Sequence, residues 1–137
     1  MQRVNWWAIV VSAIVFFLIG ALWYGVLFKN AWLAAVGTQA QPSGSGMIAY
    51  PFVVAIVMAF FLAYGLARVL GWRGDVSPLY GAFIGASMGL LIFGTMTWMD
   101  YVYEMRGATL GFINVGYVVV GMAVMGMILA RWARKTS

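Results

Sequence analysis

The chain has 137 residues, of which 65% are hydrophobic and 8% are charged, and it contains no cysteine and no histidine. Soluble domains are about 45–50% apolar and about 25% charged, so this composition excludes a soluble fold of this length and indicates a membrane protein. The missing residue types exclude disulfides, thiolate zinc sites and a histidine general base, so we expect no metal site and no cofactor. The net charge is +5, and the basic residues lie beside apolar segments. This arrangement predicts membrane lipids with anionic headgroups as partners rather than nucleic acid.

Four apolar runs are each long enough to cross a bilayer as a helix of about 20 residues. They cover residues 6–28, 47–69, 78–98 and 110–130. A membrane barrel would instead need alternating segments of about 10 residues. The sequence therefore predicts an all-α integral membrane protein, with residues 1–137 as a single domain of four transmembrane helices in a compact bundle. The first run is too long for the apolar region of a cleaved signal peptide, so we expect it to be retained.

The segments between these runs are short or polar. Residues 29–36 predict a short interfacial segment after the first helix, with Trp32, Leu33 and Val36 facing the acyl boundary. The polar stretch 38–46 predicts a flexible loop. Pro78 suits the first turn of the third helix, because proline needs no backbone hydrogen bond there.

The distribution of basic residues predicts the orientation in the membrane. Four spans place both chain ends and the loop between the second and third spans on one side. The basic residues of that side are Arg3, Arg68, Arg73, Arg131, Arg134 and Lys135. The charged residues of the other side are Lys29, Asp100, Glu104 and Arg106. Because lysine and arginine collect on the cytoplasmic side, we expect both termini to be cytoplasmic.

Small residues recur along two of the predicted helices. They are Ala55, Ala59, Ala63 and Ala67 in the second span, and Gly81, Gly85 and Gly89 in the third. Spacing of four places each set on one helix face, where another backbone can approach closely. We predict that these strips pack within the chain, against each other or against neighbouring helices, and a homo-oligomer interface through the glycine strip is the alternative. Gly116, Gly121 and Gly126 in the fourth span recur every five residues and share no face.

Ionisable residues are absent from the middle of every predicted span, which argues against proton-coupled transport. Asp100 and Glu104 share one helix face if the third helix continues to about Arg106. They then form either a cation or proton uptake site or an ordinary solvated helix end paired with Arg106.

Polar and aromatic residues mark the outer ends of the first and fourth spans. Asn114 and Tyr117 are expected to bond to other helices, since a polar group in lipid needs a partner. A second group consists of Trp23, Tyr24, Gly25, Phe28 and Trp32. These residues either anchor the helix in depth or line a pocket that opens sideways to lipid and binds an acyl chain, a quinone or another apolar ligand.

The stretch Gly20-Ala21-Leu22-Trp23-Tyr24-Gly25-Val26-Leu27-Phe28 and the residues around Trp32 resemble the opening of a bacterial membrane family catalogued as domain of unknown function 1761. Residues 112–117 and 125–129, followed by Trp132, are similar to the closing helix of that family. The resemblance extends over nearly the whole chain. It implies a bacterial cytoplasmic (inner) membrane protein, and it implies no activity.

The leading functional hypothesis is a small non-enzymatic membrane protein, an accessory or interaction subunit in a larger membrane complex or a homo-oligomer. The first alternative is a binder or carrier of a small apolar ligand, such as a lipid or quinone, at the outer aromatic cluster. The last is a membrane enzyme that uses Asp100 and Glu104, although three carboxylates in the chain offer few catalytic arrangements.

Overall fold

The computed structural model describes residues 4–37 and 45–133, with side chains described over this range except for 45–48. Of the residues used above to predict orientation, Arg3, Arg134 and Lys135 lie outside the described residues, as do positions 38–44 of the predicted loop. Four helical stretches of the described chain are long and apolar enough to span a membrane. The prediction of an all-helical membrane protein with four spans packed together is therefore confirmed.

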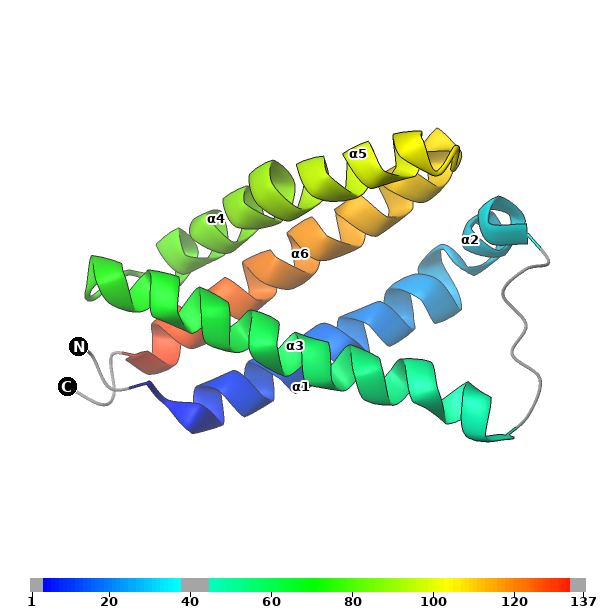
Figure 1. The fold of residues 1–137 in the computed structure, drawn as a ribbon. Coiled ribbons are helices and arrows are strands. Elements are labelled where there is room, and N and C mark those ends of the chain that lie inside the picture. The colour runs from blue at the N-terminus through cyan, green and yellow to red at the C-terminus, as the bar shows by residue number, and fades with distance from the viewer. Residues whose placement is uncertain (1–3, 38–44, 134–137) are drawn as a thin grey trace.

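The four spans are built in different ways (Figure 1). The first consists of helix α1, Trp6–Leu22, continued by the π-helical turn η1, Trp23–Leu27. The second is a single helix, α3, Ser45–Arg73. The third joins α4, Pro78–Met88, through the π-helical turn η3, Gly89–Gly94, to α5, Thr95–Tyr103. The fourth is α6, Ala108–Ala133, and the short helix predicted after the first span is α2, Lys29–Val36.

The helices of the second, third and fourth spans extend beyond the apolar runs that predict them, and α6 does so by two residues at its start and three at its end. Helix α3 begins at Ser45, inside the stretch 38–46 that was expected to be a loop. The third span continues past residue 98 to Tyr103. High hydropathy identifies only the part of a helix that lies in the hydrocarbon core of the bilayer. Polar residues at the membrane–water interface can still continue the helix.

Side chains and glycines fix the helix ends on the side where both described chain ends lie. Oδ1 of Asn5 accepts hydrogen bonds from the amides of Trp7, at 3.1 Å, and Ala8, at 3.3 Å, and so caps α1. Oγ of Ser77 caps α4 in the same way, with Pro78 in the first helical turn as predicted. Gly74, with φ of +80°, makes the turn between α3 and α4 in a conformation that disfavours other residues.

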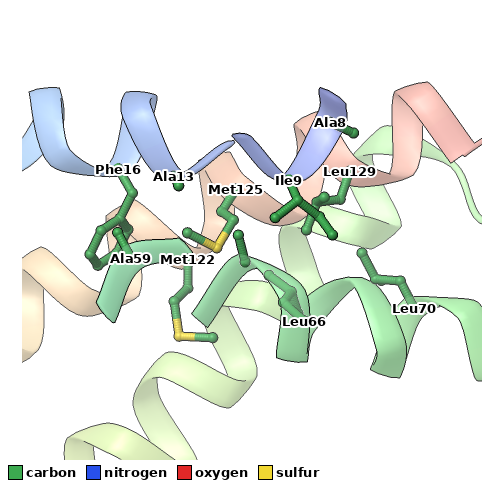
Figure 2. Close-up of a cluster of buried hydrophobic side chains, with 11 residues drawn as sticks. Ala8, Ile9, Ala13, Phe16, Ala59, Leu66, Leu70, Met122, Met125 and Leu129 are labelled. Carbon is green, nitrogen blue, oxygen red and sulfur yellow. The ribbon is translucent and has the colours of Figure 1, made fainter. Parts of the chain in front are cut away.

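The hydrophobic core lies where α1, α3 and α6 meet (Figure 2). Its largest fully buried apolar side chains are Ile9, Leu66, Met122 and Met125. Of the alanine strip on α3, Ala59 and Ala63 are buried in this core, Ala67 is partly buried and Ala55 is exposed. Part of that strip therefore lies at the place where α3 crosses α1, and the strip ends where α3 diverges from the bundle (Figure 1).

The glycine strip of the third span lies against α6, beside which α4 runs (Figure 1). A side-chain carbon at Gly85 would overlap the carbonyl oxygen of Met122, and one at Gly81 would overlap that of Gly126. The two backbones are thus in direct contact. The strip meets α6 and not the alanine strip of α3, and close packing of backbones is what holds helices together in lipid.

The glycines at spacing five on α6 each face a different neighbour. A step of five residues turns an α-helix by about 140° beyond one full turn, so successive members look in different directions. Gly116, Gly121 and Gly126 receive, in that order, the ring of Trp23, the ring of Phe16 and the backbone at Gly81. The spacing therefore reflects the position of α6 between the first and third spans.

Candidate functional site

The outer ends of η1 and α6 are joined by two hydrogen bonds, each donated by an aromatic side chain that the sequence singled out. The indole N–H of Trp23 donates to the carbonyl oxygen of Ile113 at 3.0 Å. The hydroxyl of Tyr24 donates to Oδ1 of Asn114 at 2.6 Å. Both bonds connect residues 90 positions apart, so they bring the start and the end of the chain together.

Asn114 also reaches the third span. Its Nδ2 donates a hydrogen bond to the hydroxyl oxygen of Tyr101 on α5. One side-chain amide thus connects the first, third and fourth spans. All three side chains of this group are partly buried. We call Tyr24, Asn114 and Tyr101 the tyrosine–asparagine network.

Tyr101 is not among the residues that the sequence singled out, so its place in this network was missed. A usable signal was present in the third span. The glycines at 81, 85 and 89 recur every four residues, and Gly94 follows after five. Since a π-helical turn such as η3 bonds each residue to the fifth one along, Gly94 stays on the face toward α6. Trp98 and Tyr101 continue that face at spacings of four and three.

Tyr117 connects α6 to α1 close to the tyrosine–asparagine network. Its hydroxyl donates to the carbonyl oxygen of Phe16 at 3.1 Å. Its ring lies 4.8 Å from that of Phe16 and 5.2 Å from that of Tyr24, measured between centroids. The ring of Trp32, on α2, lies 5.7 Å from that of Tyr24 in an edge-on contact. The short helix α2 is therefore held against the bundle by an aromatic pair.

The remaining members of the predicted aromatic group divide in two. The ring of Phe28 packs against that of Trp23, with centroids 4.7 Å apart. Gly25 is exposed, and no atom of the described residues lies within 4 Å of a side-chain carbon built on it, so no described helix approaches closely there.

The carboxylates Asp100 and Glu104 lie at the end of α5, and both are exposed. The helix ends at Tyr103 and does not continue to Arg106, although the amide of Glu104 still donates to the carbonyl oxygen of Asp100 at 2.8 Å, as in a helical turn. Nε of Arg106 donates a hydrogen bond to the carboxylate of Glu104, and the two side chains form an ion pair. Both partners are about half exposed, which makes this a solvated surface pair with little energetic weight.

An apolar groove runs along the bundle between α6 and the joined η3 and α5. It has a volume of about 700 Å³. It is lined by Leu90, Gly94, Thr95, Trp98, Met99, Phe112, Val115, Gly116, Val119 and Val120. The hydroxyl of Thr95 is occupied by the backbone carbonyls of Leu91 and Ile92, both at 2.9 Å, so the groove wall is almost wholly apolar.

The groove and the aromatic group meet at Gly116. This glycine lines the groove, and the ring of Trp23 lies 3.1 Å from where a side-chain carbon of residue 116 would be. Anchoring of the helix and the lining of a lipid-facing pocket stay the two alternatives for Trp23, Tyr24, Gly25, Phe28 and Trp32. The groove lies beside these residues, and its own lining comes from the third and fourth spans. The side chains that line the groove are apolar, as are those that face lipid. The sequence therefore does not show which helix faces border the groove.

No curated protein and no solved structure matches this chain. A family described as "Protein of unknown function (DUF1761)" matches residues 7–130, a stretch that takes in the aromatic group, the tyrosine–asparagine network and the groove. The resemblance noted in the sequence is therefore confirmed. The chain belongs to the DUF1761 family, and it is a small membrane protein of unknown function with four candidate membrane spans.

Proposed function

We propose that this protein binds one apolar chain, the acyl tail of a lipid or the isoprenoid tail of a quinone, in the groove between α5 and α6. The observation that carries the proposal is the groove itself, a space of about 700 Å³ with an almost wholly apolar wall. Ligand sites of small molecules typically have volumes of about 300–1,000 Å³ and mainly apolar linings.

The length of the groove fits one leaflet of a bilayer. Its wall on α6 runs from Phe112 to Val120, which is about 12 Å at the helical rise of 1.5 Å per residue. The hydrocarbon of one leaflet is about 15 Å deep, half of the bilayer core. A single extended tail therefore suits the groove better than a compact ligand does.

The walls of the groove are fixed in position by packing outside it. The ring of Trp98 lies over Gly111, where a side-chain carbon would come within 2.7 Å of it. It also meets the ring of Phe112 edge-on, with centroids 5.0 Å apart. The packed ring of Trp98 and the glycines at positions 94 and 116 shape the groove, and a binding surface that is already formed favours binding.

Photo-crosslinking of the protein in nanodiscs tests this proposal. Phospholipid and quinone analogues with a diazirine on the tail are compared, and the labelled residues are mapped by mass spectrometry. We expect labelling at groove residues by one of the two analogues.

Val120→Phe should reduce this labelling about tenfold, because the added ring occupies the groove. Val57→Phe is the matched control, since Val57 on α3 is 43% exposed and Val120 is 42% exposed. Equal labelling of all four spans would contradict a specific site.

The role of an accessory subunit, in a larger membrane complex or a homo-oligomer, is a second candidate. It is supported by how little of the described chain lies outside the spans, with α3 joined to α4 and α5 joined to α6 by short turns. A partner would then be met inside the bilayer, for example by the outer half of α3, where Phe52, Val53 and Ile56 are exposed. Native mass spectrometry of gently extracted protein tests this role, and a monomer without a second polypeptide would contradict it.

We further propose that the protein lies in a bacterial inner membrane with both termini in the cytoplasm. Support comes from Arg68, Arg73 and Arg131, which lie near the ends of α3 and α6 at one end of the bundle, whereas Lys29 and Arg106 lie at the other. Carboxyl-terminal fusions to a fluorescent protein and to alkaline phosphatase test the orientation. Fluorescence without phosphatase activity is the expected result, and the reverse would contradict it.

A further inference from the structure

A second, smaller pocket lies at the opposite end of the bundle from the tyrosine–asparagine network. It has a volume of about 90 Å³ and is formed where α1 begins and where α3 and α6 end. Its apolar wall includes Ala8, Leu70 and Leu129, which lie together at one end of the core cluster in Figure 2. Its polar wall includes Asn5, Arg68 and Trp72.

The polar side chains of this wall mainly donate hydrogen bonds. A guanidinium and an indole N–H only donate. Oδ1 of Asn5 is occupied by the amides that it caps, which leaves the Nδ2 donor of this side chain for another partner. The lining contains no aspartate and no glutamate. Asp75, the nearest carboxylate along the chain, is exposed, and it makes no ion pair with Arg68 within the described residues.

Arg68 is the charged residue of this wall, and it forms no salt bridge with another described residue. It lies more than one helical turn before the end of α3 at Arg73, and it is partly buried. A guanidinium removed from water is costly unless an anion compensates its charge. Arg73 and Arg131 are exposed near the same end of the bundle, and they add positive potential rather than relieve it.

We infer that this pocket binds the phosphate group of an anionic phospholipid. The guanidinium fork of Arg68 matches two phosphate oxygens, which a point charge such as lysine does less well. A space of about 90 Å³ holds a phosphate-sized group and not an acyl tail. The tails then lie along the apolar helix surfaces. This site is independent of the groove, which lies between α5 and α6.

Native mass spectrometry of the full chain tests the inference, with dioleoyl phosphatidylglycerol and dioleoyl phosphatidylcholine offered in equal amounts. The wild-type protein should retain the anionic lipid in preference. Arg68→Gln should reduce this preference about tenfold, the effect of one charge-assisted hydrogen bond, and Arg68→Lys should retain part of it. Arg131→Gln is the matched control, because Arg131 is exposed and does not line the pocket. It should change the preference by less than about twofold.

Three results would overturn the inference. One is an absence of preference in the wild-type protein. Another is an equal loss in Arg131→Gln and Arg68→Gln, which would mean that diffuse surface charge attracts the lipid. The last is complete displacement of the lipid by inorganic phosphate, which would assign the pocket to a free anion. The thermal unfolding of each variant is measured in parallel, and Arg68→Lys keeps the test valid if Arg68→Gln fails to fold.

Discussion

The hydroxyl of Tyr24 donates a 2.6 Å hydrogen bond to Oδ1 of Asn114, a residue 90 positions further along the chain. Because Asn114 also donates to Tyr101, this one contact connects three of the four spans. Among the described side chains of the second span none takes part in it, and the outer half of α3 diverges from the bundle (Figure 1). The hydrogen bonds therefore hold the outer ends of the first, third and fourth spans together, in a region where the buried core cluster contributes less.

Removing the hydroxyl of Tyr24 tests how much the tyrosine–asparagine network contributes to the stability of the protein. We expect Tyr24→Phe to lower the free energy of unfolding by about 1 kcal/mol, because Oδ1 of Asn114 loses its donor. Tyr50→Phe is the matched control, since Tyr50 on α3 is 70% exposed. Equilibrium unfolding in mixed micelles of a mild detergent and SDS measures both variants. Equal losses would show that the network has no special weight.

A methyl group at Gly85 tests the contact between α4 and α6. Gly85→Ala should destabilise the protein by about 3 kcal/mol, because the new carbon overlaps the carbonyl oxygen of Met122 and the two backbones must separate. Gly65→Ala on α3 is the control, since nothing lies within 4 Å of a carbon placed there. That change should be neutral or stabilise by up to about 1 kcal/mol. Similar behaviour of the two variants in the same unfolding assay would contradict the packing described.

The contact between Gly121 and Phe16 is tested by a double-mutant cycle. A side-chain carbon at Gly121 would lie 2.5 Å from the ring of Phe16, so Gly121→Ala should destabilise by about 2 kcal/mol. Phe16→Leu alone should also destabilise, because it removes part of a buried ring. The two changes together should cost less than the sum of the single losses, since the smaller side chain leaves room for the methyl group. Strict additivity would mean that the two residues do not touch.

Replacing Ser12 is expected to stabilise the protein, unlike the three changes above. Its side chain is completely buried, and within the described chain its Oγ has no hydrogen-bond partner. Ser12→Ala should raise the free energy of unfolding by up to about 1 kcal/mol, because it removes a polar group buried without compensation. Ser87→Ala provides a comparison at a partly buried serine on α4. A clear loss of stability in Ser12→Ala would reveal a partner for this hydroxyl.

Some features of the site were readable in the sequence because they depend on a single helix. Asn114 and Tyr117 stand out as polar groups in an apolar span, and the structure gives both of them interhelical partners. Tyr101 did not stand out, because tyrosine is common at the ends of membrane helices. Its role follows from the extra residue of η3, which rotates α5 relative to α4. Composition does not mark a π-helical turn of this kind, and its trace in the sequence is the change of glycine spacing from four to five between Gly89 and Gly94.

The sequence by itself determined the number of spans and their approximate limits. In lipid every backbone amide and carbonyl must be bonded within the chain, so a long apolar run has little choice but to form a helix. Only the tertiary structure decided which faces meet. In a soluble helix the apolar stripe marks the buried side, but here the lipid-facing sides are as apolar as the packed ones. The partners of Gly85 and Gly116, the groove beside Trp98 and the pocket at Arg68 therefore depend on shape, which emerges only when the helices are packed together.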